Sequence, residues 1–222
     1  MKHEWRKKEK EIYLPKNKPQ TIKVPPYKYL TIEGQGNPNN QAFSEYIGVL
    51  YSLSYAIKMS YKKGSKPEGY IDYTVYPLEG IWDINEEAKK NFTGTINKDD
   101  LIYKLMIRQP DFVDTDFVQQ IIAQTKDKKP HKLLSSVKFE TIEEGTCIQM
   151  LHLGSYDNEP ESFKLMEAYA TEHDLERHSK IHKEIYLSDA RKTAPEKLKT
   201  VLRFQVKPKK CKSNEVTSFE AI

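Results

Sequence analysis

The sequence predicts an α+β fold built from a β-α-β-β unit that occurs twice. Segments with strand and helix periodicity follow one another in the same order in the two halves of the chain. In each half, one strand also ends at a glycine turn, near 36 and near 154, and a helix-start sequence follows directly. This shared plan favours an internal duplication.

In the first half, the glycine turn ends a predicted strand at 27–36. The next segment, 37–60, begins with helix-start residues and has apolar side chains at helical spacing, at Phe43, Ile47, Leu50, Leu53 and Ile57. The aromatic stretch 69–84 predicts a strand or hairpin. A further strand is expected at 101–110, closed by a proline, and a helix at 115–129.

The second half repeats this order. A strand is predicted at 145–156, and a helix with an acidic first turn at 158–175. Two strands follow, at 181–189 and 198–206. The sequence TAPE at 193–196 between them resembles a capping box on a short helical turn.

These patterns divide the chain into four parts. Residues 1–26 form an N-terminal extension, 27–130 the first β-α-β-β half, and 131–207 the second half. The remaining stretch, 208–222, has no periodicity, and we expect a disordered tail there.

Composition excludes several classes of protein. The chain of 222 residues is 37% hydrophobic and 31% charged, so it can bury a core. It has no apolar run long enough for a transmembrane helix, and its charged N-terminus lacks the apolar stretch of a signal peptide. With only two cysteines, a cytoplasmic protein is expected. The net charge of +4 comes from nearly balanced charges, so no nucleic-acid or membrane partner is predicted.

The predicted strand at 181–189 places an acid between two ring side chains. His182, Glu184 and Tyr186 fall on one face, and Ile185 and Leu187 on the other. If the first face is exposed to solvent, Glu184 is an ordinary surface residue. If that face lines a cavity, Glu184 is the best candidate for chemistry in the chain.

A resemblance to a known family favours the cavity over the exposed surface for Glu184. The sequence LGSYDNEPESFKLMEAYATEHDL, with HKEIYLSDARKTAPEKLKTVLRFQV after it, resembles the GyrI-like small-molecule-binding domain. In the first half, GYIDYTVYPLEGIWDI and YKLMIRQPDFV are similar to strands of the stand-alone branch of that family. The resemblance spans roughly residues 1–207.

The resemblance implies a pseudo-two-fold pair of β-α-β-β units forming an antiparallel sheet. It places helices on one face of the sheet and an aromatic-lined ligand pocket on the other, with an acidic residue in the pocket. Glu184 matches that acid by its motif. The stretch before the first strand is too short for the DNA-binding module of related multidrug-sensing regulators. One stand-alone branch is similar to hydrolases that open the cyclopropane ring of DNA-alkylating natural products.

Candidate site residues follow from this resemblance and from residue chemistry. Glu184 is expected to act as the base toward water, and Tyr70 as the donor to a ligand oxygen. The expected ligand-binding residues are aromatic or flexible side chains, together with the two neighbours of Glu184: Tyr73, Tyr76, Trp82, Tyr103, Met106, His182 and Tyr186. Tyr103 and Met106 alternate along one strand, so only one of them should reach the pocket.

No metal or cofactor is expected. His178 and His182 have the spacing of a helical metal site, but they lie between a loop and a strand. The predicted partner is an aromatic or cationic drug-like ligand. A non-catalytic module that sequesters or senses drugs is the alternative, and a topoisomerase-docking module is a third possibility that the positive net charge disfavours. The sequence leaves the oligomeric state open.

Overall fold

A computed structural model describes residues 2–64 and 67–209. The tail predicted at 208–222 begins within the last strand, which ends at Pro208, and its residues 210–222 lie outside the described residues. The strands are β1 (Gln20–Val24), β2 (Tyr27–Gln35), β3 (Leu78–Ile84), β4 (Leu101–Gln109), β5 (Lys138–Ile142), β6 (Gly145–Leu153), β7 (Leu175–Arg177), β8 (His182–Tyr186) and β9 (Lys199–Pro208). The helices are α1 (Trp5–Lys8), α2 (Lys10–Tyr13), α3 (Gln41–Lys58), α4 (Glu86–Lys90), α5 (Thr115–Lys128) and α6 (Glu159–Glu172).

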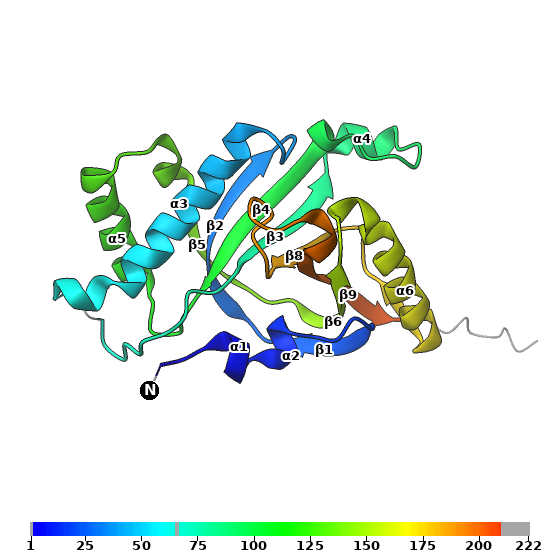
Figure 1. The fold of residues 1–222 in the computed structure, drawn as a ribbon, viewed down its shortest axis with the longest axis horizontal. Coiled ribbons are helices and arrows are strands. Elements are labelled where there is room, and N and C mark those ends of the chain that lie inside the picture. Colours follow the sequence, from blue (N-terminus) through cyan, green and yellow to red (C-terminus); the bar gives the residue numbers. More distant parts are fainter. Residues whose placement is uncertain (1, 65–66, 210–222) are drawn as a thin grey trace, which may run out of the picture.

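The strands join in one antiparallel sheet in the order β1-β6-β9-β8-β3-β4-β2-β5, with β7 paired to β9 (Figure 1). The order β2-α3-β3-β4 recurs as β6-α6-β8-β9, so the α+β fold with two β-α-β-β units is confirmed. The two units meet where β3 pairs with β8. The division of the chain at residue 130 stays a prediction.

The outer strands cross between the units. β1 precedes the first unit in the chain but pairs with β6 of the second, and β5 pairs with β2 of the first. The stretch 1–26, expected as an extension, therefore includes one edge strand of the sheet.

The two glycine turns have the same structural role. Gly36 follows β2 and Gly154 follows β6, with φ angles of 98° and 122°. Side chains other than hydrogen are strongly disfavoured at such angles. Each turn directs the chain from a strand toward a helix that packs back on the sheet, which positions α3 and α6.

The stretch 69–84 differs from its prediction, because only β3 in its second part is a strand. The earlier part satisfies its backbone through other segments. Thr74 donates to the carbonyl of His3, and the carbonyl of Tyr73 accepts from the Lys58 ammonium at 2.5 Å. Its alternating aromatic residues therefore do not form a hairpin.

A buried ionic cluster occupies the sheet face opposite α3 and α6. Lys183 binds Glu79 at 3.0 Å and Glu144 at 2.8 Å, and Arg203 binds Glu144 at 3.1 Å. The segment around α2 covers this cluster, where the Ile12 carbonyl accepts a hydrogen bond from Arg203. The two faces of β8 thus carry different chemistry, with Lys183 on one side and Glu184 on the other.

Candidate functional site

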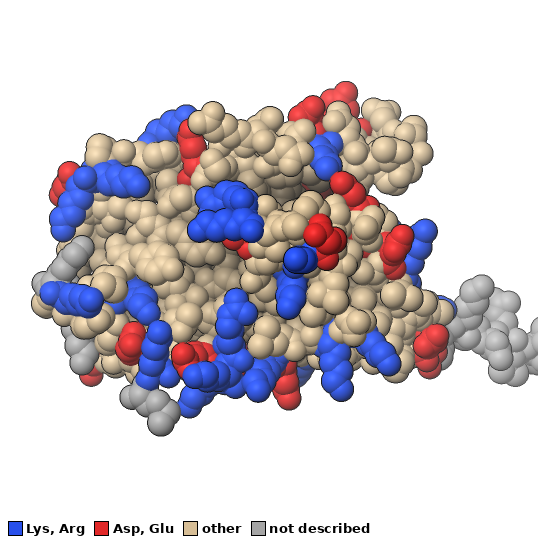
Figure 2. Space-filling view, in the orientation of Figure 1, with Lys and Arg blue, Asp and Glu red and all other residues tan. Residues whose placement is uncertain are grey.

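A cavity of about 1800 Å³ lies between α3 and α6, above β3 and β8. In Figure 1 these helices lie to either side of the strands, and in Figure 2 this face is largely tan with a patch of Lys and Arg near its middle. Much of its wall is apolar or aromatic, including Phe43, Ile47, Tyr51, Leu78, Trp82, Phe92, Tyr156 and Phe163. The pocket was expected opposite the helices, whereas this cavity lies on the same side of the sheet as α3 and α6. The helices stand apart and leave the strands between them uncovered, while the opposite face is filled by the ionic cluster.

Glu184 lines this cavity, with 8% of its surface exposed. Strand alternation places His182 and Tyr186 beside it on the same face. The His182 Nε2 lies 3.1 Å from the Glu184 Oε1, and the His182 Nδ1 lies 3.5 Å from the Lys180 carbonyl. The side chain of Glu184 is therefore held from one side and faces the cavity from the other.

Tyr186 connects Glu184 to the first unit. The Trp82 Nε1 donates a hydrogen bond of 2.8 Å to the Tyr186 hydroxyl, which leaves the phenol proton for Glu184. Burial and the negative charge of Glu184 raise the pKa of Tyr186 well above its usual value, so this proton stays in place. Gly80 provides the space, because a Cβ there would lie 2.8 Å from Trp82 Nε1 and 3.3 Å from the Tyr186 hydroxyl.

A second carboxyl group, from Glu159, faces Glu184 across the cavity floor. Glu159 begins α6 and is followed by Pro160, a residue that favours the first turn of a helix. It is 7% exposed, and its Oε1 has no hydrogen-bond partner among the described residues. Burial, and then the charge of Glu184, raise its pKa well above the usual value. Glu159 is thus the member of the pair that retains a proton.

The carboxyl pair and His182 form a compact group. One ligand atom from each of Glu159, His182 and Glu184 can be chosen so that all three lie within 4.8 Å of one another. This spacing would also suit a divalent cation. A proton on Glu159 would also relieve the repulsion between the two carboxyl groups.

The structure brings some predicted site residues together and separates others. Glu184, Trp82, Tyr76, His182 and Tyr186 all line the cavity. Tyr70 lies elsewhere, with its hydroxyl donating to the Lys58 carbonyl at 2.9 Å and its ring against Phe112. It therefore cannot donate to a ligand beside Glu184.

The other three predicted binding residues are part of the interior. Tyr73 is 2% exposed and packs against Tyr76. Tyr103 lies under α3, edge-on to Phe43, and does not line the cavity itself. Met106 is fully buried on the opposite face of β4, as alternation with Tyr103 requires. These residues support the floor of the cavity or the core.

The sequence analysis missed Glu159, Tyr156 and Phe163. Phe163 packs edge-on against His182, with ring centroids 4.8 Å apart, and Tyr156 packs edge-on against Tyr186 at 6.1 Å. The acidic first turn of α6 was a visible signal, but it is equally typical of an ordinary helix start. Only the packing of α6 beside β8 distinguishes the two.

Comparison with known proteins identifies the family of this chain. The family model of the GyrI-like small molecule binding domain matches residues 17–207. The chain belongs to this family. Among solved structures, a protein from Listeria innocua described as a hydrolase shares 34% identity with this GyrI-like protein, with a TM-score of 0.84. That match covers 92% of this chain and 100% of the other. An uncharacterized conserved protein from the same organism shares 35% identity, covers 92% and 100%, and has a TM-score of 0.81.

A more distant structure shows the same fold. The C-terminal domain of EcmrR has a TM-score of 0.50 at 11% identity, covering 86% of this chain and 98% of that one. None of the curated proteins compared matches this GyrI-like protein. Within the described residues, no helix is long and apolar enough to cross a membrane.

Proposed function

We propose that the cavity binds a planar aromatic small molecule and that Glu184 activates water to open a strained cyclopropane ring in it. The observation that carries this proposal is a nearly buried carboxylate in the floor of a large, aromatic-lined cavity. A carboxylate in such a place has few competing water molecules, and its charge acts strongly on a bound ligand.

In the proposed reaction, the water oxygen attacks a cyclopropane carbon while Glu184 takes a proton from the water. The new C–O bond forms as one ring C–C bond breaks. The electron pair moves through the conjugated ring to its carbonyl oxygen, which becomes a phenolate. Because that oxygen lies at the far end of the ligand, it points toward the cavity mouth, where solvent supplies its proton.

Aromatic walls hold the ligand for this reaction. The ring centroids of Phe43 and Trp82 lie 5.9 Å apart on one side of the cavity. Phe163 and His182 lie against each other on the other side. Stacking on such rings contributes about 0.5–1.5 kcal/mol per contact beyond burial of apolar area. The likeness to a Listeria innocua protein described as a hydrolase, over nearly the whole chain, supports a catalytic role.

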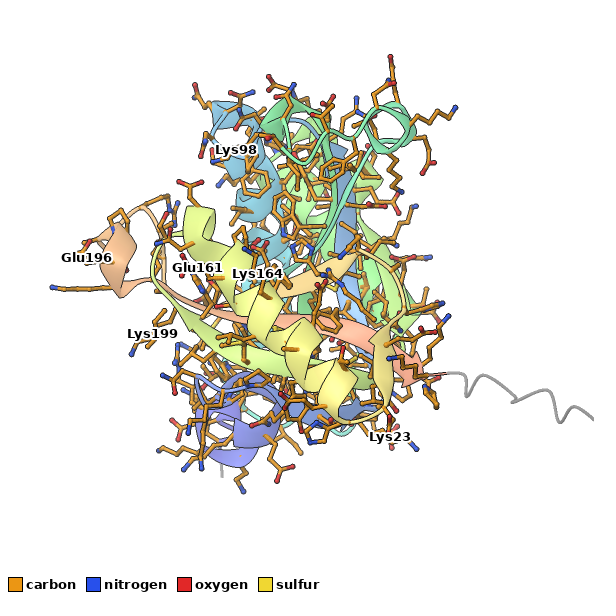
Figure 3. The ribbon with its side chains drawn as sticks, turned by 90° about the vertical axis from the view of Figure 1, so that its right-hand side faces the viewer. Lys23, Lys98, Glu161, Lys164, Glu196 and Lys199 are labelled. Carbon is orange, nitrogen blue, oxygen red and sulfur yellow. The ribbon has the colours of Figure 1, made fainter. Side chains whose placement is uncertain are left out.

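Incubation with a cyclopropane-bearing alkylator, followed by mass spectrometry for the gain of one water, tests the proposal. Glu184→Gln keeps the size of the side chain and removes the base. We expect a fall in turnover of about 10²–10⁴-fold with ligand binding, followed by tryptophan fluorescence, retained. Glu161→Gln is the control, because this exposed glutamate lies on α6 and outside the cavity (Figure 3).

Tight binding without a hydrated product from the wild type contradicts the catalytic part. The cavity would then serve a module that sequesters or senses aromatic compounds. Equal turnover by wild type and Glu184→Gln would remove Glu184 from the mechanism while leaving hydrolysis in place.

A further inference from the structure

Glu159 and Glu184 have unequal surroundings although they face the same space. Glu184 has the His182 Nε2 at 3.1 Å and the Tyr186 hydroxyl beside it, two groups that can donate to a carboxyl oxygen. Glu159 has one oxygen without any hydrogen-bond partner, and no cationic side chain of residues 2–64 or 67–209 forms an ion pair with it. Negative charge is therefore more stable on Glu184, and the proton is more stable on Glu159.

Two carboxyl groups held in opposite protonation states form an acid–base pair. Here the acid and the base project into one cavity, and a carboxyl oxygen of one lies within 4.8 Å of a carboxyl oxygen of the other. An acid and a base in one small space act together most directly on a substrate in which the bond being made and the bond being broken share an atom. That condition restricts the class of substrate.

We propose that this protein also hydrolyses epoxides carried on aromatic compounds, with Glu184 as the base and Glu159 as the acid. In an epoxide, the carbon that water attacks is bonded directly to the oxygen that leaves. In the cyclopropane compounds, the oxygen that receives the electrons lies at the opposite end of a ring. The short separation of the pair suits the epoxide.

The proposed step converts an epoxide and one water molecule into a diol. Water attacks one epoxide carbon, the new C–O bond forms, and the old C–O bond to that carbon breaks. Glu184 takes a proton from the water, and Glu159 gives its proton to the departing oxygen, which yields a vicinal diol. The proton now on Glu184 then returns to Glu159 across the short gap, and the pair is restored without any cofactor.

The aromatic walls determine which epoxides fit. Aromatic rings lie close to the pair, because Tyr156 packs against Tyr186 and Phe163 against His182. An epoxide attached to an aromatic ring can stack there while its oxygen points to the floor of the cavity. This inference rests on the proposed function, because it uses the same cavity and the same base.

The test uses trans-stilbene oxide and a cyclopropane-bearing alkylator as separate substrates in water enriched in ¹⁸O, with a chelator present to exclude adventitious metal. We expect wild type to give a diol that contains one ¹⁸O atom. Glu159→Gln removes the transferable proton, and we expect it to lower epoxide opening by about 10²–10⁴-fold. Its effect on the cyclopropane substrate should be much smaller, because that reaction does not take a proton from Glu159.

Binding of both substrates to Glu159→Gln, measured by tryptophan fluorescence, verifies that the cavity is intact, and Glu161→Gln again serves as the control. Hydration of the cyclopropane by wild type with the epoxide left unchanged would overturn this inference and leave the proposed function standing. An equal loss of both activities in Glu159→Gln would overturn the assignment of Glu159 as the epoxide's acid. Epoxide opening without cyclopropane hydration would support the inference and contradict the substrate of the proposed function.

Discussion

The indole nitrogen of Trp82 donates a hydrogen bond of 2.8 Å to the hydroxyl of Tyr186, and this bond joins the two halves of the protein at the candidate site. Trp82 belongs to β3 and Tyr186 to β8, the strands at which the two units meet. The phenol oxygen accepts this bond, which leaves the phenol proton for Glu184, the proposed base in the second unit.

Trp82→Phe should therefore lower turnover as well as stability. The aromatic ring is kept and one hydrogen bond, of about 0.5–1.5 kcal/mol, is lost, which corresponds to about a two- to tenfold fall in kcat. A double-mutant cycle with Tyr186→Phe measures the coupling between the two residues. Fully additive effects of the two substitutions would show that the bond does not contribute.

Gly80→Ala should damage the same bond by steric pressure. Its new methyl group would lie 2.8 Å from the Trp82 Nε1, and we expect a loss of stability of about 1–3 kcal/mol together with weaker activity. Gly48→Ala is the control, because a Cβ there meets nothing within 4 Å in the middle of α3. That substitution should raise stability by about 0.5–1 kcal/mol. Chemical denaturation of both variants tests the contrast.

Glu159→Gln should stabilise the protein in a pH-dependent way. Burial and the charges of Glu184 and Asp157 raise the pKa of Glu159. The folded state therefore holds a proton that the unfolded chain releases, and wild-type stability falls as pH rises from 4.5 toward the raised value. His182 and Tyr186 also face this pair but remain in the variant.

The side-chain amide of the Glu159→Gln variant does not titrate, so the stability of the variant should not fall in this way as pH rises. Melting temperatures of wild type and variant should be similar at pH 4.5 and should diverge in favour of the variant by pH 8. A constant difference across this range would mean that Glu159 has no raised pKa. This measurement needs no substrate.

The ionic cluster on the opposite face should control stability in acid. Although burial opposes its ionisation, the charges of Lys183 and Arg203 lower the pKa of Glu144 below the usual 4.5. Its contribution is complete above pH 4.5 and is lost as pH falls through the lowered value. Lys183→Met leaves Glu79 and Glu144 without their shared cation, and we expect a cost of about 3–5 kcal/mol at neutral pH. Urea denaturation at pH 7 and thermal melts between pH 3 and 7 test both effects.

Phe92 at the cavity mouth should contribute to binding and not to folding. Its side chain is 53% exposed and lines the cavity. Phe92→Ser should weaken binding of an aromatic ligand severalfold, with a stability change within about 0.5 kcal/mol. Leu153→Ser is matched in exposure, at 52%, but lies away from the cavity. If both substitutions affect fluorescence-monitored binding equally, Phe92 does not contact the ligand.

The sequence by itself determined the order of the elements and the face on which Glu184 lies. Periodicity and the two glycine turns are local properties, so they predicted α3, α6 and most strands to within a few residues. Strand alternation likewise placed His182, Glu184 and Tyr186 together. The stretch containing Tyr70 and Tyr73 misled this reasoning, because its backbone partners lie at His3 and Lys58, far away in the chain.

Only the tertiary structure decided which side of the sheet holds the cavity and which second carboxyl group faces Glu184. The gap between α3 and α6 depends on how two helices pack on a twisted sheet, and no local pattern records that spacing. Glu159 is 25 residues from Glu184 and has the sequence signature of an ordinary helix start. Its burial beside another carboxyl group, and hence its proton, follows from packing alone.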